Sequence, residues 1–149
     1  MKISADTLKK FSEKKVAFIE RMGLGVVESK PRYVKLKAPL EGNENHIGIM
    51  YAGALFTLAE VPGGALFATS FDTSKYYPIV KELSIRFRRP ATTDVTIEME
   101  MTTEEIERIQ AQADENGKAD YILEGEIKDA SGEVVALSKG IYQIRAVAG

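Results

Sequence analysis

Hydrophobic and polar residues alternate over much of the chain, as they do in strands that bury one face and expose the other. The alternation is clearest where Leu83, Ile85 and Phe87 share one face of a predicted strand and polar residues occupy the other face. The last two strands are expected to form a hairpin over the polar turn 129–133. In chain order, the pattern predicts strands over residues 24–29, 32–38, 83–88, 95–101, 121–128 and 134–144.

Two segments have the features of amphipathic helices. Hydrophobic residues recur near helical spacing over residues 8–22, and Gly23 can end that helix in a left-handed cap. Thr102 followed by Glu105 is a capping box, in which each side chain accepts a hydrogen bond from the backbone N–H of the other residue. A short helix is therefore predicted over residues 103–114.

The segment from Ile47 to Phe71 is apolar except for a single charge, Glu60. Its length would cross a bilayer, since about 20 apolar residues suffice. Glu60 near the middle, the Pro62-Gly63-Gly64 interruption and the lack of basic residues near either end argue against a membrane span. A helix that is apolar all round is also typical of a helix wrapped by a sheet. We therefore expect a long central helix from about residue 52 to residues 70–73.

These elements predict an α+β fold in which one antiparallel sheet curls around the central helix. The sheet needs its concave face filled and the helix needs cover, so each can bury the other. A chain of 149 residues has the length of one domain. We expect residues 1–149 to form a single domain, with a helix in residues 1–23 and the core in residues 24–145.

The composition excludes several classes of function. The chain has 20 Lys and Arg against 22 Asp and Glu, and this net charge of −2 argues against general nucleic-acid binding. It has no cysteine, which excludes disulfides, thiolate metal sites and a cysteine nucleophile. The single histidine, His46, excludes a multi-histidine metal site within one chain, so no metal is expected. Charged residues occupy the region where a secretory signal would be apolar, so a cytoplasmic protein is expected.

Glu60 is the strongest candidate for chemistry. Burial would raise the pKa of such a carboxyl group toward the range that suits a general base. The alternative is that the helix turns to solvent at Pro62 and leaves Glu60 merely exposed. The functional interpretation is favoured because charged residues are seldom buried without a task. The residues one turn away supply no cation: Phe56, Thr57, Gly63 and Gly64.

The start of the central helix is the second candidate. A helix N-terminus offers free N–H groups that can polarise a carbonyl group or stabilise an oxyanion. Gly53 would let a ligand approach the backbone closely, because glycine has no side chain. Simple packing is the alternative, since small residues also let a sheet close over a helix.

Residues 45–60 carry a family resemblance. The run Asn45-His-Ile-Gly-Ile-Met-Tyr-Ala-Gly-Ala-Leu-Phe-Thr-Leu-Ala-Glu60 resembles the Asn-x-x-Gly-x-x-His-Gly-Gly-(x)6-Asp/Glu motif of hotdog-fold thioesterases, specifically the phenylacetyl-CoA thioesterase-like branch. The strand that ends in Arg-Arg-Pro-Ala at residues 88–91 and the last hairpin are similar to two further landmarks of the family. The resemblance covers roughly residues 24–145. It implies a hotdog fold, with an extra N-terminal helix, that is normally dimeric.

Carried over by position, the resemblance makes Glu60 the general base or nucleophile. It makes the Gly53 N–H the oxyanion donor and Asn45 a polar contact near the thioester. Tyr51 stands where the family usually has histidine, and Ala52 replaces the first glycine of the motif. Both are expected to contact the substrate. Some members have a hydroxyl residue one turn beyond the acid, where this chain has Gly64.

Helix geometry adds an expectation about assembly. Gly53 and Glu60 are seven residues apart, which is about 10 Å along one helix. A base and an oxyanion donor must both lie within about 3 Å of the reacting carbon and its water. Two antiparallel helices across a two-fold axis meet this requirement, so we predict a homodimer whose sites each take Gly53 from one subunit and Glu60 from the other. A dimer and a tetramer both stay open.

Basic residues suggest how a substrate would be held. Arg86, Arg88 and Arg89 could bind the phosphates of coenzyme A or of a phosphopantetheine carrier, together with Lys81 and Lys139. A solvated strand face is equally compatible with them. His46 could contact the substrate or be structural. Coenzyme A would enter as part of the substrate, and no separate cofactor is expected. Four hydrophobic residues suggest an apolar acyl or aryl pocket: Met50, Phe56, Phe67 and Leu83.

Three functions remain open. The leading hypothesis is an acyl-CoA or acyl-carrier thioesterase. A hotdog dehydratase or hydratase would need a histidine–acid pair, which His46 and Glu60 could form, but its pattern places the helix-start glycine five residues before the acid rather than seven. A non-catalytic protein that binds acyl thioesters is the third, because Tyr51, Ala52 and Gly64 depart from the hydrolase motif.

Overall fold

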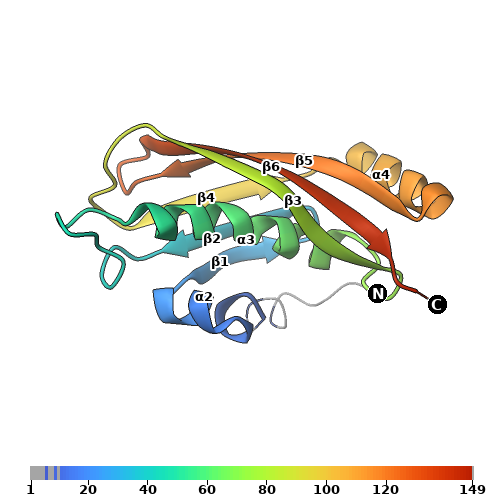
Figure 1. Ribbon diagram of the computed structural model, residues 1–149, viewed down its shortest axis with the longest axis horizontal. Helices are drawn as coiled ribbons and strands as arrows, with labels where there is room; N and C mark the ends of the chain where they lie inside the picture. Colours follow the sequence, from blue (N-terminus) through green and yellow to red (C-terminus); the bar gives the residue numbers. More distant parts are fainter. Residues whose placement is uncertain (1–5, 7–8, 10, 149) are drawn as a thin grey trace.

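The computed structural model describes residues 6, 9 and 11–148. Its helices and strands follow one another along the chain as drawn in Figure 1. In order, they are η1 (Phe11–Lys15), α2 (Ala17–Met22), β1 (Gly25–Lys30), β2 (Tyr33–Ala38), α3 (Ala52–Ser70), β3 (Tyr76–Phe87), β4 (Val95–Glu100), α4 (Thr103–Asn116), β5 (Lys118–Lys128) and β6 (Val134–Ala146).

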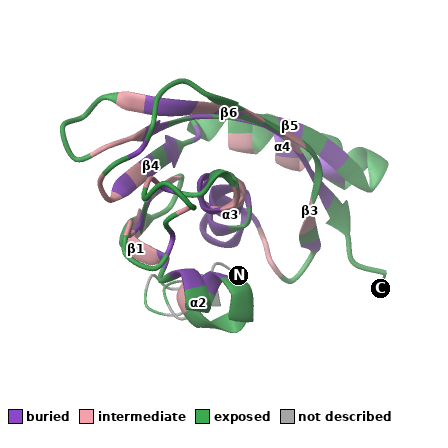
Figure 2. Cartoon of the chain, turned by 60° about the vertical axis from the view of Figure 1, so that its left-hand side comes forward, coloured by how far each residue is buried: buried purple, intermediate pink, exposed green. Residues whose placement is uncertain are grey.

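The six strands form one sheet in the order β1-β2-β4-β5-β6-β3, and every neighbouring pair is antiparallel. Figure 2 looks along α3 and shows the strands curling around it, with α2 beneath. The helix α4 packs against β5 and β6. The predicted α+β architecture, a curled antiparallel sheet around a long central helix, is therefore confirmed.

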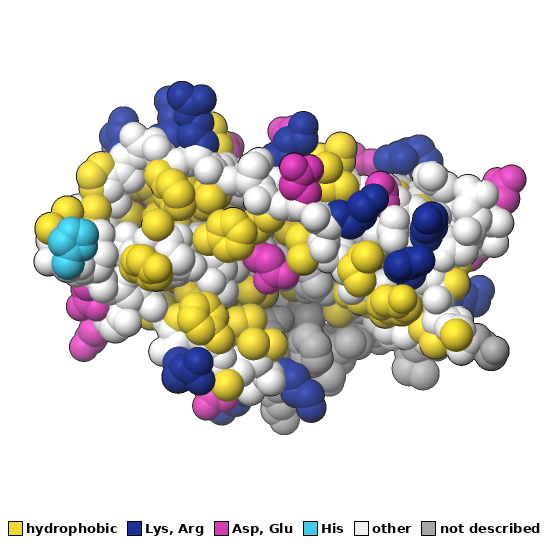
Figure 3. All heavy atoms as spheres, viewed as in Figure 1, with side chains coloured by type: hydrophobic (Ala, Val, Ile, Leu, Met, Phe, Trp, Pro, Cys, Tyr) yellow, Lys and Arg dark blue, Asp and Glu magenta, His cyan; other side chains and the backbone are white. Residues whose placement is uncertain are grey.

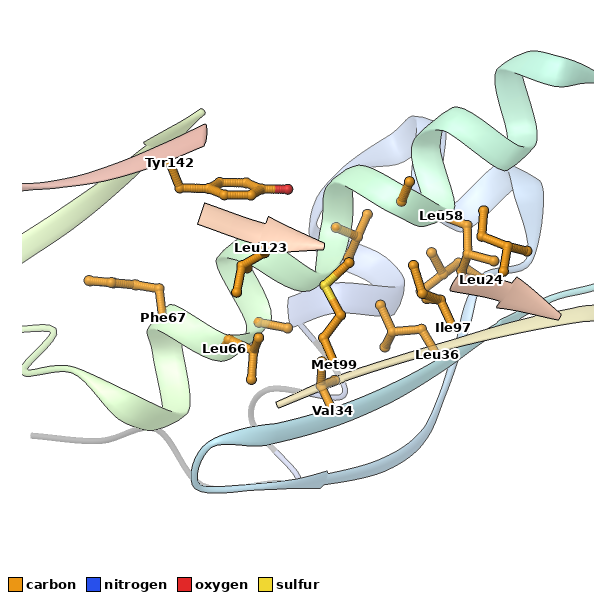
Figure 4. Close-up of a cluster of buried hydrophobic side chains, with 14 of the residues drawn as sticks. Leu24, Val34, Leu36, Leu58, Leu66, Phe67, Ile97, Met99, Leu123 and Tyr142 are labelled. Atoms are coloured by element: carbon orange, nitrogen blue, oxygen red, sulfur yellow. The ribbon is translucent and has the colours of Figure 1, made fainter. Parts of the chain in front are cut away.

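Burial of α3 explains why its sequence is apolar on nearly all sides. Of its 19 residues, 13 are buried, and Leu58 and Leu66 are completely enclosed. They lie in one hydrophobic cluster with Leu36 and Ile97 of the sheet (Figure 4). Each such leucine contributes roughly 1.5–3 kcal/mol. α3 is long and apolar enough to cross a membrane by composition alone, but 67% of the relevant window is already buried inside the fold.

The N-terminal helix departs from the prediction of one continuous element. Val16 adopts an extended conformation, with φ −102° and ψ 116°, and separates η1 from α2. A hydrophobic repeat indicates which residues face the core, but it does not require an unbroken backbone. Gly23 caps α2 with φ 74°, as predicted. Leu8, part of the predicted helix, lies outside the described residues.

The strand β3 is longer than predicted, because it begins at Tyr76 rather than Leu83. It lies at the edge of the sheet and pairs only with β6. An edge strand can accommodate Pro78, whose backbone has no N–H to donate. Tyr77, Val80 and Phe87 are 44%, 45% and 49% exposed, so this edge presents apolar side chains.

Candidate active site

One face of α3 is left open by the sheet. The residues on it recur at helical spacing and are exposed or half-buried, although the rest of the helix is enclosed. Figure 3 shows hydrophobic side chains gathered over α3, with an acidic side chain among them. We call this surface the open face of α3; it consists of Ala52, Gly53, Phe56, Thr57, Glu60 and Gly64.

Glu60 lies half-buried in the middle of the open face. Burial raises the pKa of its carboxyl group above the ordinary value of 4.5, and no other group contributes to the shift. Among the described residues, no cation forms an ion pair with it. An acid in such surroundings binds a proton more readily than one in water, which suits a general base.

The start of α3 leaves two backbone donors unused. Tyr51 caps the helix without a side-chain hydrogen bond, and its carbonyl accepts from Ala54 N (3.0 Å) and Leu55 N (3.3 Å). The part of the chain that the structure describes offers no acceptor to the N–H groups of Ala52 and Gly53. These N–H groups can therefore donate to an incoming carbonyl oxygen or oxyanion.

Tyr51 shapes the surface around Gly53. A carbon added at the Cβ position of Gly53 would lie 2.4 Å from Cε2 of the Tyr51 ring, so a side chain at this position would require the ring to move. Tyr51 also lines a hollow of about 280 Å³ together with Phe18 and Arg21 of α2. Sequence reasoning missed this hollow, because nothing in the hydrophobic pattern of α2 indicates how far that helix lies from α3.

Asn45 organises the turn that leads into α3. Its Oδ1 accepts hydrogen bonds from Ile47 N (3.0 Å) and Ile49 N (3.3 Å), and Gly48 adopts φ 87° within the same turn. This geometry gives Asn45 a structural role in addition to the predicted contact with substrate. His46 lies exposed on the turn. Among the described residues, no ion pair joins His46 to Glu60, so the structure does not assemble the histidine–acid pair of a dehydratase within one chain.

A cavity of about 370 Å³ joins the start of α3 to the end of β3. It brings together residues from both family motifs, which lie 32 to 46 positions apart in the sequence. Arg89 forms an ion pair with Glu133, whereas Arg88 has no acidic partner among the residues described. Arg88 is therefore the cation available to an anionic ligand. The cavity is lined by Asn45, Ile49, Met50, Ala52, Leu55, Phe87, Arg88, Arg89, Pro90 and Ala91.

The other predicted basic residues lie elsewhere. Arg86 pairs in register with Leu137, on the face of the sheet turned away from α3, and lines a separate groove of about 690 Å³ with Lys139. Lys81 is held by Asp120 at 2.9 Å. The structure thus does not bring these three residues to the cavity at the helix start.

Only part of the predicted acyl pocket lies at the site. Met50 lines the cavity and Phe56 is on the open face. Phe67 instead stacks on Phe71 in the core, with ring centroids 6.0 Å apart. Leu83 is half-buried on β3. No group of three or more metal-ligating side chains occurs among the described residues.

The structure adds one residue that sequence reasoning missed. Tyr142 of β6 donates from its hydroxyl group to the backbone oxygen of Glu60 at 3.3 Å. In the sequence, the one indication of a role for Tyr142 is its position on the inward face of a predicted strand. Tyr142 and Glu60 are 82 positions apart in the sequence, and they meet only because the sheet curls around α3.

Comparison with known proteins places this arrangement in a family. Residues 5–142 match the domain of unknown function DUF4442. The chain belongs to this family. No curated protein matches the chain. A crystal structure from Pseudomonas aeruginosa, described as a protein of unknown function and probable thioesterase, is 51% identical over 99% of each chain, with a TM-score of 0.95.

More distant structures share the fold of this DUF4442 protein. A protein of unknown function from Chlorobaculum tepidum has a TM-score of 0.82 at 21% identity and covers 94% of this chain and 93% of its own. A Haemophilus influenzae thioesterase has a TM-score of 0.76 at 10% identity and covers 100% of this chain and 95% of its own. The resemblance to the hotdog fold is therefore confirmed, and the phenylacetyl-CoA branch stays a prediction.

Proposed function

We propose that this protein is a thioesterase that hydrolyses an acyl thioester of coenzyme A or of an acyl carrier. One observation carries the proposal: a half-buried carboxyl group without a cationic partner shares the open face of α3 with two unused N–H groups at the helix start. The 51% identity to a crystal structure described as a probable thioesterase supports the same reaction.

In the proposed reaction, Glu60 removes a proton from a water molecule, and the resulting hydroxide attacks the thioester carbonyl carbon. The Gly53 N–H and the positive end of the α3 dipole stabilise the negative oxygen of the tetrahedral intermediate. The carbon–sulfur bond then breaks, and the thiolate takes the proton from Glu60. Direct attack by the Glu60 carboxylate, followed by hydrolysis of the anhydride, is the alternative route.

We further propose that the site is shared between two subunits. Gly53 and Glu60 lie on the same face of α3 but about 10 Å apart along its axis, too far to act on one carbonyl group. An antiparallel α3 from a second copy would bring its Glu60 to Gly53. The exposed apolar side chains of edge strand β3 support such an interface, because an unpaired edge is a natural surface for strand pairing.

A panel of acyl-CoA substrates with a thiol-detecting reagent tests the reaction. Release of free thiol by the wild type and its loss in Glu60→Gln, with acyl-CoA binding retained, is the expected result. Binding without turnover in the wild type would instead support the non-catalytic alternative. That alternative is favoured by Gly64, which places no hydroxyl group one turn after the acid.

Mixing two inactive variants tests the shared site. Gly53→Pro removes the donor N–H in the first turn of α3, and Glu60→Gln removes the base. Gly53→Ala is the control for Gly53→Pro, because it adds a Cβ beside the Tyr51 ring but keeps the N–H. A heterodimer of Gly53→Pro and Glu60→Gln contains one intact site, so refolding an equimolar mixture should restore about a quarter of the wild-type rate. No recovery from a mixture shown by mass to contain heterodimers would mean that each subunit uses its own Gly53 and Glu60.

A further inference from the structure

The side chain of Tyr142 reaches the turn of α3 that carries Glu60. Its hydroxyl group donates to the Glu60 backbone oxygen at 3.3 Å, and the residue is only 2% exposed. The neighbouring Tyr121 donates to the backbone oxygen of Gly63 at 3.4 Å. Two tyrosines of adjacent strands therefore bind the same turn of the helix.

The surroundings of Tyr142 leave its ring little freedom. A carbon added at Gly63 would lie 2.1 Å from its Cε1 atom, and one added at Gly140 would lie 2.5 Å from its Cε2 atom. The ring also stacks on Tyr121, with centroids 5.5 Å apart and planes inclined by 22°. Two glycines and a second aromatic ring thus hold the Tyr142 hydroxyl at one place.

The helix needs such support at this turn. Pro62 lies inside α3 and has no N–H, so the carbonyl of Leu58 loses its usual helical donor. A helix can kink where this hydrogen bond is missing. The two tyrosine hydroxyls lie on either side of Pro62 in the sequence, at Glu60 and Gly63, and tie the weakened turn to the sheet.

We propose that Tyr142 is a positioning residue for Glu60, and this inference rests on the proposed hydrolytic role of that acid. By binding the Glu60 backbone oxygen, Tyr142 fixes the turn of α3 from which the carboxyl group projects onto the open face. Burial raises the pKa of Tyr142, with a smaller contribution from Glu60, so the hydroxyl stays protonated and can donate. Burial raises the pKa of the Glu60 carboxyl group, so this pKa reports whether the group keeps its half-buried place.

The test compares Tyr142→Phe with the matched control Tyr121→Phe, which removes the hydroxyl that binds Gly63 instead. In Tyr142→Phe, kcat should fall about tenfold with little change in KM, since the base is displaced while substrate binding is unaffected. The acidic limb of the pH–rate profile should also move to lower pH, because burial raises the pKa of the Glu60 carboxyl group and a displaced carboxyl group is less buried. Tyr121→Phe should lose a similar amount of thermal stability, but the acidic limb of its pH–rate profile should stay where it is in the wild type.

A second measurement does not depend on hydrolysis. Carbon-13 NMR of the glutamate carboxyl groups, with the Glu60 signal assigned by Glu60→Gln, should show a lower Glu60 pKa in Tyr142→Phe than in the wild type or in Tyr121→Phe, because the displaced carboxyl group is less buried. An unchanged Glu60 pKa in folded Tyr142→Phe overturns the inference. A wild-type protein without thioesterase activity would refute the proposed function, and the NMR comparison would still decide the role of Tyr142.

Discussion

The ring of Tyr51 lies beside the α-carbon of Gly53, so close that a Cβ atom on Gly53 would be 2.4 Å from the ring carbon Cε2. Tyr51 occupies the position where the family motif usually has histidine, and Gly53 carries the proposed oxyanion donor. The residue that departs from the motif thus contacts the residue that carries the proposed oxyanion donor. Because Tyr51 is 59% exposed, its ring has room to move away.

This contact predicts a coupling between two substitutions. Gly53→Ala should cost only about 1 kcal/mol, because the exposed Tyr51 ring can swing aside. In a Tyr51→Ala background the same change should be neutral or stabilising by about 0.5–1 kcal/mol, since alanine favours a helix over glycine. Urea unfolding of the four proteins measures the coupling. Strictly additive effects would show that the ring does not rest against Gly53 in solution.

Gly63→Ala should be far more damaging than Gly53→Ala. A carbon at Gly63 would lie 2.1 Å from Cε1 of Tyr142, which is buried and cannot leave its place. We expect a loss of about 3 kcal/mol in the free energy of unfolding. Gly25→Ala is the matched control, because nothing lies within 4 Å of the added carbon and the change should cost less than about 1 kcal/mol. Equal losses in the two variants would contradict the tight packing of Gly63.

Glu60 should make the stability of the protein depend on pH in a defined direction. Its pKa in the folded protein is raised above 4.5, so the folded state binds the proton more tightly than the unfolded chain. Stability is therefore lost as the pH rises from the unfolded value through the folded one. Glutamine at position 60 does not ionise, so Glu60→Gln avoids this loss of stability. We expect the variant to melt at a higher temperature than the wild type at pH 7.

The same variant should match the wild type at about pH 3.5, where the acid is protonated in both states. Thermal melts across this range check the prediction, with Glu41→Gln on an exposed loop as the control. The control should follow the wild type at every pH. A Glu60→Gln protein less stable than the wild type at pH 7 would indicate that the carboxylate has a favourable partner in solution.

Under the proposed function, the Arg88 guanidinium, which has no acidic partner among the described residues, would bind the phosphates of coenzyme A. Arg88→Ala should raise KM for an acyl-CoA several-fold, and added salt should shrink the difference. An acyl-pantetheine substrate, which lacks the phosphates, should be hydrolysed equally well by variant and wild type. Arg86→Ala is the control, since Arg86 lies on the other face of the sheet. Equal effects of the two substitutions would argue for general electrostatic attraction rather than a site.

Local patterns predicted much of the fold. The capping box at Thr102 and Glu105 is present, with Glu105 N donating to Thr102 Oγ1 at 3.1 Å, and Gly117 closes α4 with φ 80°. These features depend on residues within one turn of each other, so the sequence contains all that they require. The apolar sequence of α3 likewise predicted that this helix is buried.

The candidate site was predicted only in part. Asn45, Ala52, Arg88 and Arg89 meet at one cavity, in line with the resemblance that singled them out. Arg86 is only two residues from Arg88, yet it lies in a different groove. The reason is that β3 ends at Phe87, beyond which the alternation of a strand no longer decides where a side chain points.

The sequence by itself determined the helices, the strands and the presence of a lone acid in an apolar helix, because each follows from residues close together along the chain. Tertiary structure alone decided that β3 lies at an edge, that one face of α3 stays open and that Tyr142 reaches Glu60. These relationships join distant segments. They depend on which strands pair and how the sheet curls, and no local pattern of residues specifies either one.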